Sequence, residues 1–155
     1  MKRLFLICSL ASIVTLAACA STPKQSDADK LAMYQASAGE PIKDFNYSGS
    51  LNGWQPIGDS ALAVWTKPKE AYLLDLGGPC RDLEYAPAIS ITNMMGRVST
   101  LDRVRVLGGS GGVGRISCRI LSIRPLDVSK LKAAEAELRK ADVETRQEES
   151  AAPAN

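Results

Sequence analysis

The sequence of 155 residues contains no histidine. This absence excludes a Ser-His-Asp triad, a Cys-His pair and any metal site that needs a histidine ligand. Catalysis by a pair of carboxylates remains formally open, with Asp59, Asp75 or Asp82 as the acids. A small neutral domain without a catalytic motif is a poor candidate for such chemistry. We therefore expect no enzymatic activity, no cofactor and no bound metal.

The N-terminal segment lacks an apolar run long enough to span a membrane as a helix. Lys2 and Arg3 precede an uncharged run from Leu4 to Ala18. As a helix this run would measure about 22 Å, whereas a hydrocarbon core is roughly 30 Å thick. A cationic start followed by a short apolar run is typical of a secretory signal. We interpret residues 1–18 as a signal peptide rather than a permanent transmembrane helix.

The run ends in "LAAC", Leu16 to Cys19, which resembles the lipobox of bacterial lipoproteins. In such proteins the thiol accepts a diacylglyceryl group, and the small residues before it fit the peptidase that makes the cysteine the new N-terminus. The resemblance implies lipid attachment at Cys19, with two or three acyl chains giving a stable anchor. Ala20 and Ser21 follow in place of an aspartate, which implies the periplasmic face of the outer membrane. The alternative is an ordinary cleavage site with a cysteine nearby.

The mature chain lacks a net charge. The signal segment holds two basic residues, so residues 19–155 carry 17 basic and 17 acidic side chains. Binding of nucleic acid depends on a net basic surface. We therefore expect no nucleic-acid partner.

Cysteines are few, and two of the four are accounted for. Cys8 is lost with the signal and Cys19 is acylated, which leaves Cys80 and Cys118 in an oxidising compartment. We expect a disulfide between them, with two buried free thiols as the alternative. Closing a loop of about 38 residues stabilises a fold by roughly 4 kcal/mol on the chain-entropy account. A redox-active pair is disfavoured because there is no C-x-x-C.

Glycines 109, 111 and 114 spell a G-x-G-x-x-G motif, but the helix that such a motif needs is missing. A dinucleotide loop binds phosphates on the N-terminal amides of the helix that follows it. Here a β-branched, alternating run follows instead and is closed by Pro125. Glycine also suits the positive φ angles of a hairpin loop. We interpret the motif as the turn of a β-hairpin.

The region from 44 to 127 predicts a mainly β fold. Short alternating runs are separated by glycine, proline and asparagine. They predict an antiparallel meander of about six strands, closed as a small barrel or packed as a sandwich. The runs are "LNGW", "ALAVWT", "AYLLDL", "AISIT", "RVRV" and "RISCRI".

Both flanks of this domain are polar. Residues 19–43 predict a lipidated flexible tether, in which "LAMY" is either one helical turn, a docking patch or loosely ordered. Residues 128–142 predict an amphipathic helix, capped by Asp127 or Ser129. We expect this helix to pack on the sheet, with a protruding partner-binding helix as the alternative. Residues 143–155 predict a disordered tail.

Arginines gather on one face of the predicted glycine hairpin. If the apolar residues of its two strands point inward, Arg103, Arg105, Arg115 and Arg119 point outward. Four guanidinium groups repel one another unless carboxylates or an anionic ligand lie near. The carboxylates that could balance them are Asp75, Asp82, Glu84 and Asp102. The alternatives are a solvated face of mixed charge and an anion site for phosphate, a lipid headgroup or a carboxylate.

Three segments resemble an uncharacterised family of short proteobacterial lipoproteins. They are "WQPIGD" at 54–59, "AYLLDLGGPCRDL" at 71–83 and "CRILSIRPLD" at 118–127. The resemblance covers about residues 44–127 and rests on Trp54, the two cysteines and the terminal I-x-P-L-D at 123–127. It implies a shared fold and the pairing of Cys80 with Cys118, and it implies no activity.

Two kinds of function fit these observations. The first is a membrane-anchored envelope lipoprotein that acts as a structural or protein-interaction module. The second is a module that binds a small anion or lipid headgroup. The expected partners are the lipid bilayer, through acylated Cys19, and either an envelope protein or a small anionic ligand. A filled core with an exposed apolar patch favours the first, and an enclosed apolar pocket favours the second.

Overall fold

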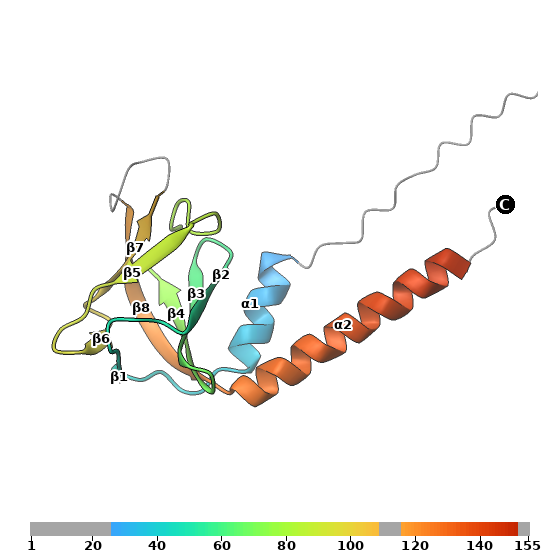
Figure 1. Cartoon of the computed structure of the whole chain (residues 1–155), viewed down its shortest axis with the longest axis horizontal. Coiled ribbons are helices and arrows are strands. Elements are labelled where there is room, and N and C mark those ends of the chain that lie inside the picture. Colours follow the sequence, from blue (N-terminus) through green and yellow to red (C-terminus); the bar gives the residue numbers. More distant parts are fainter. Residues whose placement is uncertain (1–25, 109–115, 152–155) are drawn as a thin grey trace, which may run out of the picture.

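A computed structural model describes residues 26–108 and 116–151 (Figure 1). Two helices lie on one side of a curled β-sheet. The helices are α1 (Asp27–Ala36) and α2 (Val128–Ala151). The strands are β1 (Asp44–Asn46), β2 (Gly53–Ile57), β3 (Ala61–Lys67), β4 (Glu70–Leu76), β5 (Ala88–Ile91), β6 (Arg97–Ser99), β7 (Arg103–Leu107) and β8 (Ile116–Leu126).

The main sheet has six antiparallel strands, which confirms the predicted mainly β class. Its order is β2-β3-β4-β8-β7-β5, so it is not a simple meander. After β4 the chain crosses to the far edge of the sheet, and β8 later fills the gap beside β4. Between Asp75 and Leu76 the pairing with β8 shifts by one residue, at Leu121. Such a bulge bends a strand, and the sheet curls into a half-barrel (Figure 1).

The inner face of the curl holds the larger of two apolar clusters. Leu62, Val64 and Leu74 are fully buried there. Val104 and Val106 of β7 also point inward, which confirms the predicted alternation in that strand. The short pair β1 and β6 packs Phe45 and Val98 against the same cluster. These two strands have three residues each, too few for a period of two to be recognised in the sequence.

The second cluster lies on the opposite face of the sheet, beneath the helices. Ala61 and Ala63 of β3 are buried there together with Leu73 of β4. Alanines leave room for a helix to approach the sheet closely. The helices contribute Tyr34 from α1 and Leu131 from α2. Strands β3 and β4 are therefore covered on both faces.

The tether predicted for residues 19–43 is wrong for its second half, where α1 forms. The hydroxyl of Ser26 accepts a hydrogen bond from the backbone N–H of Asp29 at 3.1 Å and caps the helix. The completely buried Tyr34 then holds α1 on the sheet. Beyond the helix, the N–H of Ile42 donates to the carbonyl of Ile123 at 2.8 Å. Burial of one aromatic side chain and a cap thus order a segment whose composition is that of a linker.

Helix α2 is longer than predicted, since it continues past residue 142 to Ala151. Residues 143–151 contain neither glycine nor proline, and glutamate, glutamine, arginine and alanine are strong helix formers. Asp127 caps the helix, as expected, by accepting hydrogen bonds from the N–H groups of Ser129 and Lys130 at 2.9 and 3.0 Å. Low apolar content was therefore a poor guide to the end of this helix.

The glycine motif joins two antiparallel strands, which confirms the hairpin interpretation. Val106 of β7 pairs with Ile116 of β8. No helix follows the glycines, because β8 begins at Ile116. Glycines 109, 111 and 114 themselves lie outside the described residues, as do Cys19 and the whole of residues 1–25.

Candidate functional site

Three of the four predicted arginines lie on the outer face of β7 and β8. Arg103, Arg105 and Arg119 are all exposed, and Arg103 and Arg119 are direct cross-strand partners. Among the described residues, no carboxylate forms an ion pair with any of these three guanidinium groups. Arg115 lies outside the described residues. The structure thus brings like charges together on one strand pair.

One of the expected balancing carboxylates is engaged elsewhere. Asp102 accepts hydrogen bonds from the N–H and the hydroxyl of Ser99, at 2.9 and 3.0 Å. It also accepts one from the hydroxyl of Thr92, at 2.9 Å. These bonds fix the turn between β6 and β7, so Asp102 serves the fold.

The two remaining cysteines form a disulfide in the structure. Their Cα atoms are 5.7 Å apart, and the bridge ties the loop after β4 to the beginning of β8. Cys80 is almost completely buried within the inner cluster. Its position gives the bridge a structural role, because it fixes the long crossing loop to the strand that this loop bypasses.

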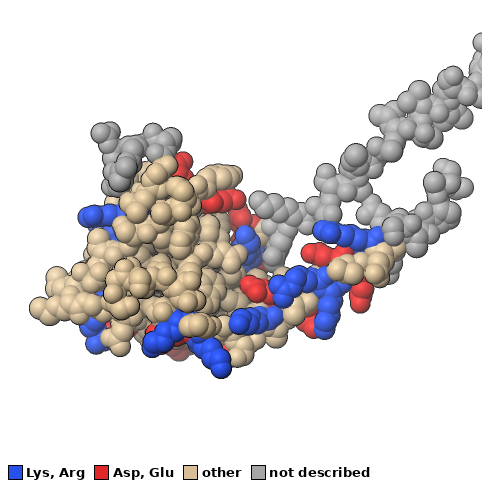
Figure 2. All heavy atoms as spheres, viewed as in Figure 1, with Lys and Arg blue, Asp and Glu red and all other residues tan. Residues whose placement is uncertain are grey.

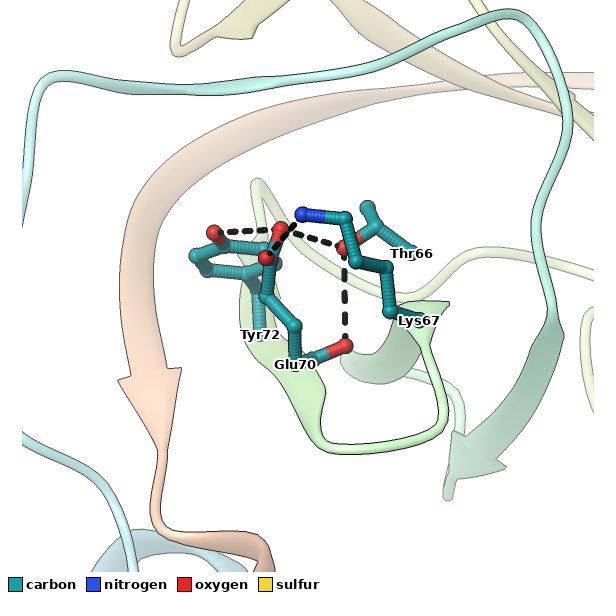
Figure 3. A network of polar contacts seen from close by, with 4 residues as sticks. All are labelled: Thr66, Lys67, Glu70 and Tyr72. Carbon is teal, nitrogen blue, oxygen red and sulfur yellow. Dashed lines mark hydrogen bonds and ion pairs between the residues drawn. The ribbon is translucent and has the colours of Figure 1, made fainter.

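A polar cluster at the β3–β4 turn was not expected from the sequence (Figure 3). Oε1 of Glu70 accepts hydrogen bonds from the hydroxyls of Thr66, at 2.6 Å, and Tyr72, at 3.2 Å. Its other oxygen accepts one from Nζ of Lys67 at 2.7 Å. The hydrogen bonds from Lys67 and then Thr66 lower the pKa of Glu70, while burial, followed by the Glu70 charge, raises the pKa of Tyr72.

An open cleft of about 360 Å³ lies beside this cluster. Tyr47 and Gly96 line it together with Thr66 and Glu70. The carboxylate of Glu70 already has three donors that hold the tight turn between β3 and β4. We therefore assign the cluster to stabilisation of this turn.

Among the described residues, helix α2 is anchored to the rest of the fold through its first turns. Val128 and Leu131 are buried against the sheet and α1. Nζ of Lys130 donates a hydrogen bond to the last carbonyl of α1, at Ala36, at 2.6 Å. Across residues 132–147, where exposure is described, no side chain is buried. The expectation that this helix packs on the sheet is therefore confirmed for its first turns only. Beyond them, Figure 1 shows α2 running away from the sheet.

The two helices diverge from this base and leave an open apolar groove of about 710 Å³ between them. On the α1 side its walls are Asp29, Ala32 and Met33. On the α2 side they are Ala134, Glu137, Leu138 and Ala141. The side chain of Leu138 is 42% exposed, although it belongs to the apolar stripe of the helix. This groove is the candidate functional site.

Other kinds of site are missing from the part of the chain that the structure describes. Within residues 26–108 and 116–151, no three histidine, cysteine, aspartate or glutamate side chains are grouped as metal ligands would be. Within the same ranges, neither helix combines the length and apolar character needed to cross a membrane.

Comparison with known families adds one match. The profile of a family of unknown function, DUF6491, matches residues 1–142. The chain belongs to this family. The DUF6491 match extends beyond the 44–127 region of the sequence resemblance, and it includes the "LAAC" segment, α1 and most of α2. No significant match was found among curated proteins or solved structures.

The groove was missed because one of its two helices was not predicted. A signal for α1 was nevertheless present. Ser26 followed by Asp29 is the spacing of a helix N-terminus in which the hydroxyl caps the helix. The divergence of the two helices has no such signal, because it depends on where α2 loses contact with the sheet.

Proposed function

We propose that the protein is a lipid-anchored lipoprotein of the cell envelope, held on the periplasmic face of the outer membrane, that works as a protein-interaction module without enzymatic activity. The observation that carries the interaction role is the exposed length of α2. Its residues 132–147 contribute no buried side chain to the fold, and with α1 they form an open apolar groove. Apolar surface of this kind, rimmed by polar residues, is characteristic of sites where other proteins bind.

The short distance between the proposed anchor and α1 supports a position close to the membrane. Seven residues separate Cys19 from Asp27. Even fully extended, this stretch of chain reaches only roughly 30 Å. A lipid on Cys19 would therefore keep α1, and the groove beside it, near the bilayer surface. A flexible tether through residue 43 would allow a much longer reach.

The anchor is tested by replacing the proposed acylation site. Cys19→Ser should move the protein from the membrane fraction to the soluble periplasm, because no acyl chain is attached. The matched control is Cys8→Ser, which changes the other N-terminal cysteine and should leave fractionation unaltered. Identical fractionation of Cys19→Ser and wild type, with no difference in lipid mass, would overturn the anchor.

The interaction role is tested by crosslinking inside cells. A photoreactive side chain at Ala141, in the groove, should give a discrete adduct with another envelope protein. The same group at Lys69, in the β3–β4 turn, should give none. Adducts of equal yield at both positions, or at neither, would count against the groove as the interaction site.

The arginine face supports a second candidate, a site for a small anion. Arg103 and Arg119 lie opposite each other without a carboxylate partner among the described residues. Phosphate, sulfate, phosphoglycerol or a dicarboxylate should then raise the melting temperature of the wild type by mass action. The variant Arg105→Gln/Arg119→Gln should lose this response. A flat response to all four anions in both proteins would remove this candidate.

A further inference from the structure

The charges on α2 are sorted around its apolar stripe. Leu131, Ala134, Leu138 and Ala141 recur at alternating intervals of three and four, so they form one line along the helix. At about 100° per residue, Glu135 and Asp142 fall beside one edge of this line. Glu137 and Glu144 fall beside the other edge. The stripe that lines the groove is therefore bordered by carboxylates on both sides.

Three of the five basic residues of α2 occupy a different part of its surface, while Lys130 and Lys140 lie on the side of Glu137. Lys132, Arg139 and Arg146 are spaced seven apart and so form their own line, beyond Glu135 and Asp142. Within the described residues, Glu137 of this rim forms an ion pair with Lys140 at 3.0 Å, and both side chains are largely exposed. Figure 2 shows this mixture of acidic and basic side chains along the protruding helix.

The other wall of the groove is also acidic. Asp29 lines it from α1, one turn before Met33. At the base, the carboxylate of Glu135 lies close enough to the Tyr34 phenol to raise its pKa, after the larger effect of burial. The apolar floor formed by Met33 and Leu138 thus has negative charge on both helices around it.

The negative charge around the groove favours some binding partners over others. A second copy of α2 would bring its own carboxylates against Glu137 and Glu144, and like charges beside an apolar seam oppose pairing. A segment with lysine or arginine beside its apolar residues would instead meet opposite charges on both edges. Residues 132–147 offer about 24 Å of helix, the length of four turns.

We propose that the groove between α1 and α2 docks an amphipathic helix of a partner protein, whose apolar stripe is flanked by lysine or arginine. This inference rests on the proposed function, because it names the class of partner for the same groove. Apolar side chains of the partner would cover Met33 and Leu138, while its basic residues would pair with Glu137, Glu144 and Asp29.

Binding of designed peptides to the full chain tests this proposal. Cys19→Ser protein is used so that no detergent is needed. One probe is an 18-residue helical peptide with a leucine stripe flanked by lysines. A second probe has the same stripe flanked by glutamates, and a third keeps the lysines but replaces the stripe with glutamine. Only the first should bind appreciably, and its affinity should fall as salt is added.

Charge reversal then assigns the binding to the groove. Glu137→Lys/Glu144→Lys should weaken the lysine-flanked peptide at least tenfold and create binding of the glutamate-flanked one. Glu40→Lys, an exposed reversal in the loop after α1, is the control and should change neither affinity. Circular dichroism and the melting temperature verify that each variant is folded.

Several outcomes would overturn the proposal. They are equal binding of the lysine-flanked and glutamine-stripe peptides, an unchanged affinity in the double reversal, or binding of none of the peptides. Self-association of the protein that is abolished by Leu138→Ser would also overturn it, because the occupant would then be a second copy. Fractionation of Cys19→Ser reports separately on the lipid anchor, so failure of the anchor and failure of the groove can be told apart.

Discussion

Two parts of one helix behave differently in this protein. The first turn of α2 is built into the fold, since Leu131 is only 2% exposed and Lys130 closes the end of α1. The following four turns have no buried side chain among residues 132–147, although they carry the same apolar spacing. The same amphipathic pattern is thus buried in the first turn of α2 and exposed in the following turns. The difference is that the sheet and α1 cover only the first turn.

The largest expected effect concerns the core to which the first turn is attached. Replacing both disulfide cysteines by alanine, Cys80→Ala/Cys118→Ala, should lower the free energy of unfolding by roughly 4 kcal/mol, because the 38-residue loop is no longer closed. Urea unfolding followed by fluorescence of Trp54 and Trp65, which both lie in the sheet, measures this loss. A change below about 1 kcal/mol would mean that the bridge adds little to the stability of the sheet.

The next effect contrasts the two parts of α2 directly. Leu131→Ala should destabilise the protein by about 3 kcal/mol, since it leaves a cavity beneath the helix. Leu138→Ala should change the stability by less than about 0.5 kcal/mol, because that side chain is 42% exposed. Thermal unfolding of the two variants, side by side, provides the measurement. Equal losses would contradict the division of α2 into a folded base and a free remainder.

A smaller effect is expected from pH and concerns the core alone. Burial raises the pKa of Tyr34, and Glu135 raises it further; burial also raises the pKa values of Tyr47 and Tyr72. The folded state therefore holds these phenolic protons more tightly than the unfolded state. Their contribution is fully present below about pH 10, the pKa of an unfolded tyrosine, and is lost as the pH rises through the folded values.

Stability should accordingly fall above about pH 10. Melting temperatures at a series of alkaline pH values measure the fall, and Tyr34→Phe should reduce its slope. The change also removes the hydrogen bond that the Tyr34 hydroxyl donates to Gln55 at 2.9 Å, so the comparison concerns the slope rather than the absolute stability. An unchanged slope in the variant would mean that Tyr34 does not contribute to the alkaline loss.

The smallest effect concerns the arginine face. Arg103→Gln should raise the stability by a few tenths of a kcal/mol, because it removes the like charge opposite Arg119. Raising the salt concentration should shrink the difference between variant and wild type. A loss of stability in the variant at low salt would show that the two guanidinium groups are balanced by other charges.

Sequence patterns predicted the sheet better than the helices. The alternation of Val104 and Val106 and the run after the glycines predicted the hairpin, because a period of two leaves one face buried. The order of strands was not predictable, since the crossing from β4 to β5 has no local signal. Helix α1 was missed because its order depends on packing against the sheet, which the small side chains of Ala61 and Ala63 permit. These residues are distant from α1 in the sequence.

The candidate groove was only half accessible to sequence reasoning. The stripe through Leu131 and Leu138 predicted an amphipathic helix, but the same stripe fits packing on the sheet and free exposure equally well. The outcome depends on the direction in which α2 leaves Asp127, and this is set by bonds such as that from the N–H of Asp127 to the carbonyl of Ser37, at 2.9 Å. The pairing of the cysteines, in contrast, followed from their number and from the resemblance.

Native-state hydrogen exchange tests the division of α2 most directly. In the isolated protein, amides of β4 and β8 should be protected to nearly the global stability, whereas amides of residues 136–147 should exchange much faster, through local opening of an unsupported helix. Adding the lysine-flanked peptide should slow exchange in residues 136–147 and leave β4 and β8 unchanged. Protection of these α2 amides equal to that of β8 without the peptide, or no change on its addition, would contradict the account.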